Sequence, residues 1–246
     1  MSNFVDFHVH IDYYKDYWNI YEQYNTEKIY ALFVTNFPEV YLKAKSHFPT
    51  SKYVKIALGF HPENALVRNF NTKLFFELIK DTKYVGEVGL DFSSKFLASK
   101  DKQIEVFNQI AKISGQTNKI LTVHSRKAEK EVLQVLQNNN VKFAVFHWYS
   151  GEVSLIEHIA NAGYYFSINP SMLRSKHGRE IIHKIPKNRL LIESDGPFGK
   201  LNTQLIEPVL IKDVYKAFEK EMGVENLKDL VYRNLEVLLK NQLHGR

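Results

Sequence analysis

Polar side chains recur at every second position of the apolar segment FVDFHVHID, residues 4–12, as Asp6, His8 and His10. In a β-strand, alternate residues point to the same face, so all three would project one way. Polar groups on a buried strand face cost free energy unless something satisfies them. A metal ion would do so, because neutral imidazoles and carboxylates are metal ligands. One His-x-His pair is weak evidence, so a metal site requires further ligands elsewhere in the chain.

Histidines and acids also occur near the ends of other apolar runs. They are His61, Glu87, Asp91, His124, His147 and Asp195. Each has a simpler interpretation by itself. A lone histidine in a strand is more often a satisfied core residue, and the proline in GFHP, residues 59–62, can end a strand. GEVGLD, residues 86–91, can be a glycine-bounded turn with solvated acids. We favour a metal centre, because the simpler interpretations need a coincidence at six strand ends.

The apolar runs that carry these residues alternate with segments of helical periodicity. Eight runs read as strands, at residues 4–10, 29–37, 53–62, 84–92, 119–126, 142–151, 164–171 and 189–198. Helical candidates lie at residues 101–114, 127–138, 152–162, 205–220 and 225–240. Strand–helix alternation predicts right-handed βαβ units and a parallel sheet. Eight repeats in 246 residues predict an α/β fold of the closed (β/α)8 TIM-barrel type. Periodicity leaves a doubly wound open sheet as the alternative.

In a barrel the carboxyl ends of all strands ring one mouth, where barrel enzymes keep their active sites. Residues that are far apart in the sequence would therefore meet there. The resulting set contains four imidazoles and two carboxylates: His8, His10, Glu87, His124, His147 and Asp195. Such a set is typical of a site for two divalent ions, and we expect Glu87 to lie between the ions and bridge them.

Composition limits the class of protein. The chain has 44 % hydrophobic and 24 % charged residues, which is a globular composition, and we predict a single hydrolase domain over residues 1–246. The absence of cysteine excludes disulfides, thiolate metal sites and a cysteine nucleophile. No run is long enough to span a membrane, and MSNFVDFHVH lacks signal-peptide features, so we expect a cytoplasmic protein. A net charge of +6 favours a polyanionic partner such as nucleic acid, with an ordinary basic surface as the equally supported alternative.

Six short motifs occur in order, one for each of six predicted strands. They are DFHVHID (6–12), GFHP (59–62), GEVGLD (86–91), VHSRKA (123–128), FHWYSG (146–151) and LLIESDGP (190–197). In these motifs the chain resembles the TatD family of metal-dependent deoxyribonucleases, within the wider group of amidohydrolase-like barrels. The resemblance extends from residue 6 to about residue 198 and is weaker beyond.

The resemblance implies roles for individual residues. One metal would be held by His8, His10, Glu87 and Asp195, and a second by Glu87, His124 and His147. Phosphate contact or support of the ligands is implied for His61, Asp91, Arg126 and Ser150. The metal stays open between Zn²⁺, Mg²⁺ and Mn²⁺, because imidazole-rich sites suit zinc or manganese, whereas the family implies magnesium or manganese.

The function that the resemblance implies is hydrolysis of DNA phosphodiester bonds, as a 3′–5′ exonuclease on single strands. Two metals would activate the attacking water, and Asp195 would orient that water or accept its proton. The alternatives are a small-molecule amide, lactone or phosphate ester hydrolase and a non-catalytic binding subunit. Many related barrels bridge their metals with a carboxylated lysine on the fourth strand. Glu87 at that place favours the nuclease branch, and the retained ligand set argues against a binding subunit. Oligomeric state stays open.

Departures from the family pattern concern positions that would face the substrate. Trp148 and Tyr149 replace a small residue or cysteine followed by phenylalanine, and Lys127 replaces an acid. The doubt therefore falls on the substrate rather than on hydrolysis. We predict a divergent branch of the kind found in bacterial anti-phage gene clusters, with protein partners from such a defence operon.

An aromatic cluster follows the first predicted strand: Tyr13, Tyr14, Tyr17 and Trp18. These side chains can stack on nucleobases or can pack a helix onto the barrel. Packing is the favoured interpretation, because it is the commoner role of such clusters.

Overall fold

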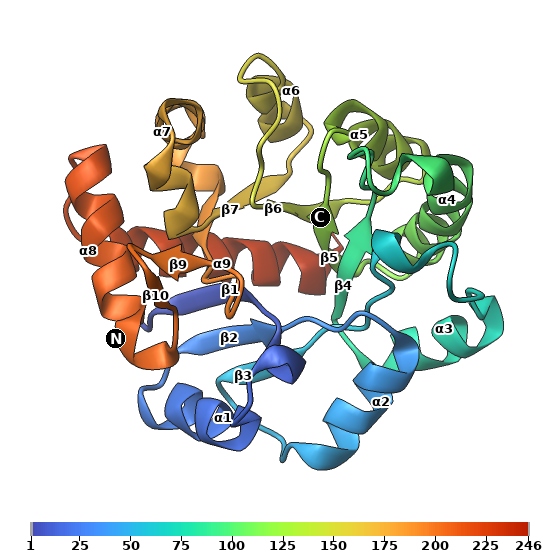
Figure 1. The fold of residues 1–246 in the computed structure, drawn as a ribbon, viewed down its shortest axis with the longest axis horizontal. Helices are drawn as coiled ribbons and strands as arrows, with labels where there is room; N and C mark the ends of the chain where they lie inside the picture. The colour runs from blue at the N-terminus through green and yellow to red at the C-terminus, as the bar shows by residue number, and fades with distance from the viewer. Residues whose placement is uncertain (1, 246) are drawn as a thin grey trace.

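The computed structural model describes residues 2–245, and eight parallel strands form the centre of this part of the chain (Figure 1). They are β1 (Val5–Val9), β2 (Tyr30–Phe33), β3 (Val54–Ile56), β4 (Tyr84–Gly89), β5 (Ile120–His124), β6 (Phe143–His147), β7 (Tyr165–Ile168) and β8 (Leu190–Ile192). Each lies within one of the eight predicted runs, in the predicted order. These runs are rich in β-branched and aromatic residues, which fit a pleated, buried surface.

The strands close into a ring at two seams. Hydrogen-bonded ladders join β1–β2–β3 and β4–β5–β6–β7–β8, with a shift of register in β1 between Asp6 and Val9 and in β4 between Val85 and Val88. At one seam Val9 forms a parallel bridge with Gly196, and the His10 backbone N–H donates to the Gly196 carbonyl at 2.9 Å. At the other seam Leu58 bridges Val85. The closure confirms the (β/α)8 barrel and excludes the open doubly wound sheet.

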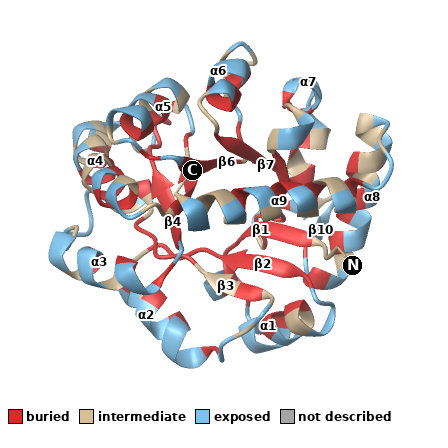
Figure 2. Cartoon of the chain, turned by 180° about the vertical axis from the view of Figure 1, so that it is seen from behind, coloured by how far each residue is buried: buried red, intermediate tan, exposed pale blue. Residues whose placement is uncertain are grey.

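Helices surround the ring (Figure 1). They are α1 (Tyr17–Thr26), α2 (Pro38–His47), α3 (Thr72–Leu78), α4 (Lys100–Gln116), α5 (Glu129–Asn138), α6 (Leu155–Asn161), α7 (Lys176–Lys184), α8 (Ile211–Met222) and α9 (Leu227–His244). Each buries an apolar stripe against the strands, as α5 does with Val132, Val135 and Leu136. The strands are buried, apart from the partly exposed β3, and the outer faces of the helices are exposed (Figure 2). None of the helices in residues 2–245 is long and apolar enough to cross a bilayer.

The last helix, α9, crosses the end of the barrel where the strands begin (Figure 2). The Asn234 side chain on α9 donates hydrogen bonds to the carbonyls of Lys187 and Leu190, at 2.7 and 2.8 Å, at the start of β8. Gln242 donates to the carbonyl of Asn118, just before β5. The α9 helix thus covers the amino ends of the strands, and the carboxyl ends lie at the opposite end of the barrel.

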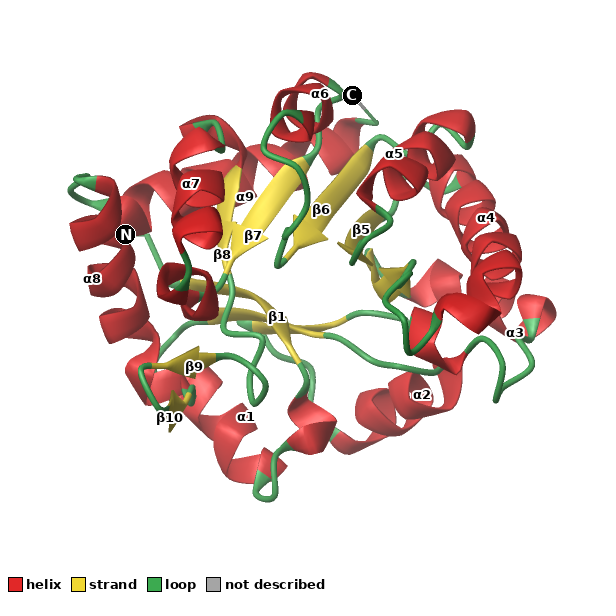
Figure 3. Cartoon of the chain, turned by 45° about the horizontal axis from the view of Figure 1, so that its top comes forward, coloured by secondary structure: helices red, strands yellow, loops and turns green. Residues whose placement is uncertain are grey.

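The predicted helix at 205–220 is wrong at its start. An antiparallel hairpin of β9 (Lys200–Leu201) and β10 (Gln204–Leu205) precedes it, and the α-helix begins only at Ile211. Figure 3 shows the hairpin beside the ring of parallel strands. Asn202 adopts a positive φ of 57° in the hairpin turn, and Pro208 begins a short 3₁₀ turn before α8. Helical periodicity of the apolar residues does not detect such turn residues.

Candidate metal centre

The carboxyl ends of six strands deliver one cluster of polar side chains. Each residue lies in the last positions of a strand or just after it. The cluster consists of His8, His10, His61, Glu87, His124, His147 and Asp195. The structure therefore brings together all six predicted metal ligands and also His61, for which the resemblance implied phosphate contact or ligand support.

Glu87 lies in the middle of this cluster and is 1 % exposed. Its Oε2 atom faces two imidazole nitrogens, His8 Nε2 at 3.3 Å and His10 Nε2 at 3.1 Å. Asp195 approaches the same two nitrogens, with its Oδ1 atom 3.8 and 3.6 Å away. His8, His10 and Asp195 thus form one group of donor atoms that can share a cation, next to Glu87 Oε2.

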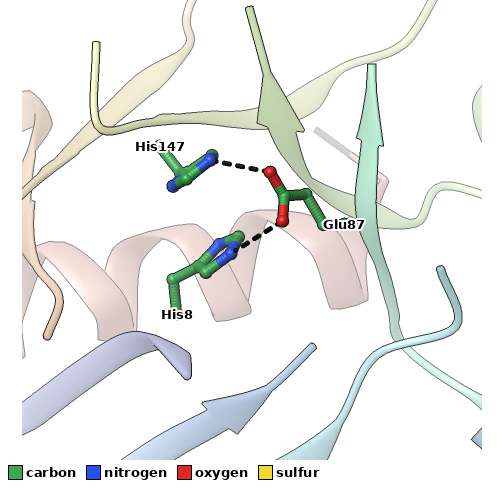
Figure 4. A group of neighbouring side chains, drawn as sticks. All are labelled: His8, Glu87 and His147. Carbon is green, nitrogen blue, oxygen red and sulfur yellow. Dashed lines mark ion pairs between the residues drawn. The ribbon is translucent and has the colours of Figure 1, made fainter. Parts of the chain in front are cut away.

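The other oxygen of Glu87, Oε1, faces three more imidazoles. His124 Nδ1 lies 2.7 Å away, His147 Nε2 2.8 Å and His61 Nε2 3.2 Å. Figure 4 shows His8 and His147 directed at different oxygens of the same carboxylate. The His147 ring also stacks on the His8 ring at 3.9 Å between centroids, so the two sides of the cluster are in contact.

Several buried polar atoms of the cluster have no hydrogen-bond partner within residues 2–245. They include Glu87 Oε2, Asp195 Oδ1 and His10 Nδ1. An unsatisfied buried polar group costs about 1–3 kcal/mol. In addition, His8 Nε2 and His10 Nε2 face each other at 3.3 Å. Imidazole nitrogens and carboxylate oxygens without partners form a donor set that a divalent cation would satisfy, and the residues present therefore fit a metal.

Burial and mutual contact set the charges of the metal-free cluster. Burial opposes ionisation of Glu87, but the neighbouring imidazoles of His61 and His147 hold its pKa well below the ordinary value. Burial lowers the pKa of His8 to about 3, which leaves this imidazole neutral and able to coordinate a metal. Burial also disfavours a charge on His124, but hydrogen bonds to Asp91 and Glu87 outweigh it and raise the His124 pKa to about 9. A metal must therefore displace a proton there.

Two of the imidazoles are oriented by a contact to the ring nitrogen that does not face Glu87. His8 Nδ1 contacts Thr122 Oγ1 at 2.8 Å, and His124 Nε2 contacts Asp91 Oδ2 at 2.9 Å. Asp91 is fully buried and does not line the cavity, so its position agrees with support of a ligand rather than with contact to phosphate. Partners of this kind fix which ring nitrogen faces the metal.

Glu193, a buried carboxylate next to His147 Nδ1, was not predicted from the sequence as a site residue. Glu193 Oε1 lies 3.4 Å from His147 Nδ1 and accepts the Trp148 backbone N–H at 3.0 Å. Its other oxygen accepts the hydroxyl of Ser167. Glu193 precedes Asp195 by two residues, the same spacing that links His8 and His10, and that signal could have identified it.

Asp6 shares the strand face of His8 and His10 but does not join the centre. Its Oδ2 atom accepts the Tyr24 hydroxyl at 2.6 Å, and Oδ1 accepts the Ser194 backbone N–H at 2.7 Å. Asp6 therefore holds β1 against the end of β8. Alternation along a strand predicted its direction correctly, but its depth in the barrel differs from that of the two histidines.

The backbone is constrained where two of these side chains leave the strands. Asp195 has φ 48° and Trp148, which follows His147, has φ 38°. The left-handed region is uncommon for residues other than glycine and aspartate or asparagine, and unusual for a bulky residue such as tryptophan. The Asp195 carbonyl accepts the N–H groups of Phe198 and Gly199 at 2.7 and 2.8 Å, and this turn fixes the position of Asp195.

A cavity of about 600 Å³ opens above the cluster. Of the residues with an implied substrate or support role, His61, Arg126 and Ser150 line it. Trp148, which the sequence indicated as facing the substrate, lines it too. The wall also contains residues that the sequence did not indicate as substrate contacts, namely Asn36, Glu63, Asn64, Ser125 and Phe198, together with Tyr13 from the aromatic cluster. These side chains come from loops after the strands, where no periodic pattern marks them.

Comparison with known proteins gives a family match over most of the chain. Residues 5–240 match the family model of TatD-related DNases. An uncharacterized metal-dependent hydrolase of Bacillus subtilis, YabD, is 27 % identical over 256 residues, which cover 96 % of this chain and 98 % of that protein. The deoxyribonuclease TATDN3 of Homo sapiens is 30 % identical over 166 residues, which cover 65 % of this chain and 61 % of that protein.

Solved structures show the same fold. The structure of YJJV, a TatD homologue from Escherichia coli K12, superposes with a TM-score of 0.85 at 19 % identity, covering 96 % of this chain and 97 % of that one. A TatD family hydrolase from Entamoeba histolytica superposes with a TM-score of 0.80 at 17 % identity, covering 96 % and 98 %. At these identities the superpositions establish the barrel architecture.

Proposed function

We propose that the candidate metal centre around Glu87 cleaves phosphodiester bonds of DNA, because this chain belongs to the TatD-related DNase family of metal-dependent hydrolases. The observation that carries the proposal is the convergence of five imidazoles on one buried carboxylate at the base of an open cavity. The name of the human relative, a deoxyribonuclease, supports DNA as the substrate.

The ligands divide into two sets around Glu87. We assign His8, His10, Glu87 and Asp195 to one divalent ion, and Glu87, His124 and His147 to a second. His61 adjoins the second set, since its Nε2 atom contacts the same Glu87 oxygen as His124 does. Bound Zn²⁺, Mg²⁺ or Mn²⁺ would supply Lewis-acid chemistry, lowering the pKa of a coordinated water and stabilising negative charge on the phosphate.

The chain's own residues complete the reaction. Asp195 Oδ1 is buried and accepts no hydrogen bond within residues 2–245. This oxygen is therefore placed to orient the attacking water or to accept its proton. Arg126 is exposed at the cavity wall, where its planar guanidinium can bind two phosphate oxygens. The Ser150 hydroxyl can donate to a further oxygen.

Single-stranded DNA cleaved from its 3′ end is the substrate we propose, on the strength of the family resemblance. The single domain over residues 1–246, the cytoplasmic location and the partners from an anti-phage operon stay predictions. Of the departures that motivate the last of these, Trp148 lies in the cavity wall, whereas Tyr149 is buried and neither Tyr149 nor Lys127 lines the cavity.

The direct test is cleavage of labelled single-stranded DNA with added Mn²⁺, Mg²⁺ or Zn²⁺, and with a chelator. We expect metal-dependent cleavage by the wild type and a loss of roughly 10³-fold or more in Glu87→Ala and Asp195→Asn. Asp213→Asn, an exposed carboxylate on α8, is the matched control and should retain activity. Full activity in both site variants would refute the assigned centre. Turnover of lactones or amides without DNA cleavage would support the small-molecule alternative.

A further inference from the structure

Two aromatic side chains stand half-exposed at the rim of the cavity. Tyr13 is 52 % exposed and Phe198 is 49 % exposed, and both line the cavity. Their ring centroids lie 4.9 Å apart with an angle of 62° between the rings. We call this pair the Tyr13–Phe198 platform. Large aromatic surfaces left in contact with water at the entrance of a polar cavity mark a binding surface.

The platform has a fixed position relative to the metal ligands. The Tyr13 backbone N–H donates to the carbonyl of His10 at 3.2 Å, and the Phe198 N–H donates to the carbonyl of Asp195 at 2.7 Å. The His10 ring centroid lies 5.7 Å from that of Tyr13 and 5.2 Å from that of Phe198. Each aromatic residue follows a candidate metal ligand by three positions, so the two loops that carry the ligands also carry the platform.

The Tyr13 ring is held in place by a polar contact rather than by burial. Its hydroxyl accepts a hydrogen bond from Asn36 Nδ2 at 3.0 Å. Tyr14 behaves as helix packing predicts, because it is buried and donates its hydroxyl to the Ile206 carbonyl. The packing interpretation of the aromatic cluster is therefore wrong for Tyr13, whose ring lines the cavity instead of the core.

The rest of the wall indicates what the platform would bind. Arg126 and Ser150 line the same cavity as the platform, and the candidate metal ligands form its base. Cationic and hydroxyl groups suit a phosphate, and aromatic faces suit a flat ring. A nucleotide contains both parts, joined by a sugar. Aromatic faces accept any base, since every base has a π-face, so the platform predicts little sequence preference.

We propose that the Tyr13–Phe198 platform stacks an unpaired nucleobase next to the scissile phosphodiester. The inference rests on the proposed function and deepens it, because it names the two side chains that would hold the base of the strand at the centre. A base within a duplex has both faces stacked on its neighbours and cannot use the platform without leaving the stack.

The experiment compares three 5′-labelled single-stranded oligonucleotides at a saturating metal concentration. One carries ordinary nucleotides throughout, one carries an abasic tetrahydrofuran residue at the 3′ end, and one carries the same residue at the penultimate position. The variants are Tyr13→Ala, Phe198→Ala and Tyr13→Phe. Phe76→Ala, which removes a 45 % exposed ring on α3, is the matched control. Thermal unfolding of each variant verifies its fold.

We expect Tyr13→Ala and Phe198→Ala to lower kcat/KM on the ordinary oligonucleotide by about 5- to 150-fold, the range of base–aromatic stacking. On one of the two abasic oligonucleotides the same variants should match the wild type within about twofold. Phe76→Ala should leave all three substrates unaffected. Tyr13→Phe keeps the ring and should lose less on the ordinary oligonucleotide than Tyr13→Ala does. Equal losses on ordinary and on both abasic oligonucleotides, or no loss at all, would overturn the inference while the proposed function stands. Absence of any wild-type cleavage, with metal bound, would instead overturn the proposed function.

Discussion

Glu87 is the residue on which the centre depends, because imidazoles of five histidines approach its two oxygens within 2.7–3.3 Å. In the metal-free chain, protons supply the positive charge that this carboxylate needs, most clearly on His124 between Asp91 and Glu87. Protons and metal therefore compete for the same nitrogen atoms. The competition gives metal-free and metal-loaded protein opposite responses to pH.

The first prediction concerns stability against pH without metal. The His124 pKa is raised from 6.5 to about 9, so its contribution to the free energy of unfolding is complete below pH 6.5 and is lost as pH rises to 9. The Asp91 pKa is lowered from 3.8 to about 2, so its contribution is complete above pH 3.8 and is lost as pH falls to 2. We expect chelator-treated protein to lose stability between pH 6.5 and 9 in urea unfolding.

Metal should reverse this trend, because coordination requires deprotonated imidazoles. The stabilisation that added metal confers should grow between pH 6.5 and 9. His124→Asn is the control, and its metal-free stability should decline less over the same interval than that of the wild type. A wild-type decline no larger than that of His124→Asn would show that this imidazole does not hold the proton.

Glu193 provides a second prediction at the residue scale. Its carboxylate contacts His147 Nδ1, the ring nitrogen that does not face Glu87, and both side chains are buried. Glu193→Gln keeps the shape but removes the negative charge, and we expect metal affinity to weaken by about 10–100-fold. Calorimetric titration with Zn²⁺ or Mn²⁺ measures the effect, with Glu180→Gln on the exposed face of α7 as the control. A metal affinity equal to that of the control would show that Glu193 does not contribute to metal binding.

The residues of the site were predictable in part. Strand-end histidines and acids identified every member of the cluster, because strand alternation and barrel geometry both bring them to one mouth. Asp6 and Glu193 show where this reasoning stops. Both have the i, i+2 spacing to a ligand, yet Asp6 binds Ser194 and Tyr24 whereas Glu193 supports His147. Spacing gives the face of a strand but not the depth at which a side chain finds its partner.

Among the elements, α9 has a role that helical periodicity could not reveal. The pattern at 225–240 predicted an amphipathic helix, but not that Asn234 would bind the carbonyls of Lys187 and Leu190 and so cover the amino end of the barrel. Long-range contacts of this kind depend on which distant segments the tertiary fold brings next to each other. The β9–β10 hairpin was missed for a different reason, because two-residue strands carry almost no alternation.

Asn234→Ala tests the role of α9. The substitution removes two hydrogen bonds, one of them to the buried Leu190 carbonyl, and we expect the free energy of unfolding to fall by about 2 kcal/mol. Activity per folded molecule should stay unchanged, because the cavity lies at the opposite end of the strands. Urea unfolding and the DNA cleavage assay measure the two effects, with the exposed Lys240→Ala on the same helix as the control. A stability equal to that of Lys240→Ala would contradict this role.

On the scale of the whole molecule, the barrel divides stability and chemistry between its two ends. The helix α9 covers one end, and the other carries candidate metal ligands from six strands around the cavity. Counting eight strand-helix repeats was enough to predict the ring. The cavity wall could not be predicted in the same way, because Tyr13, Asn36 and Phe198 lie on turns and loops after the strands, whose course depends on local backbone geometry. The candidate metal centre thus follows from the geometry of the ring, and the cavity wall follows from the loops.

Metal stoichiometry tests the central claim most directly. Purified protein is stripped with chelator, reloaded at pH 8 with Zn²⁺ or Mn²⁺, freed of excess metal and analysed for bound ions in the wild type and in Glu87→Ala. We expect two ions per chain in the wild type and loss of both from the variant, because Glu87 lies between the two donor sets. Wild-type stoichiometry retained in Glu87→Ala would contradict a centre built around this carboxylate.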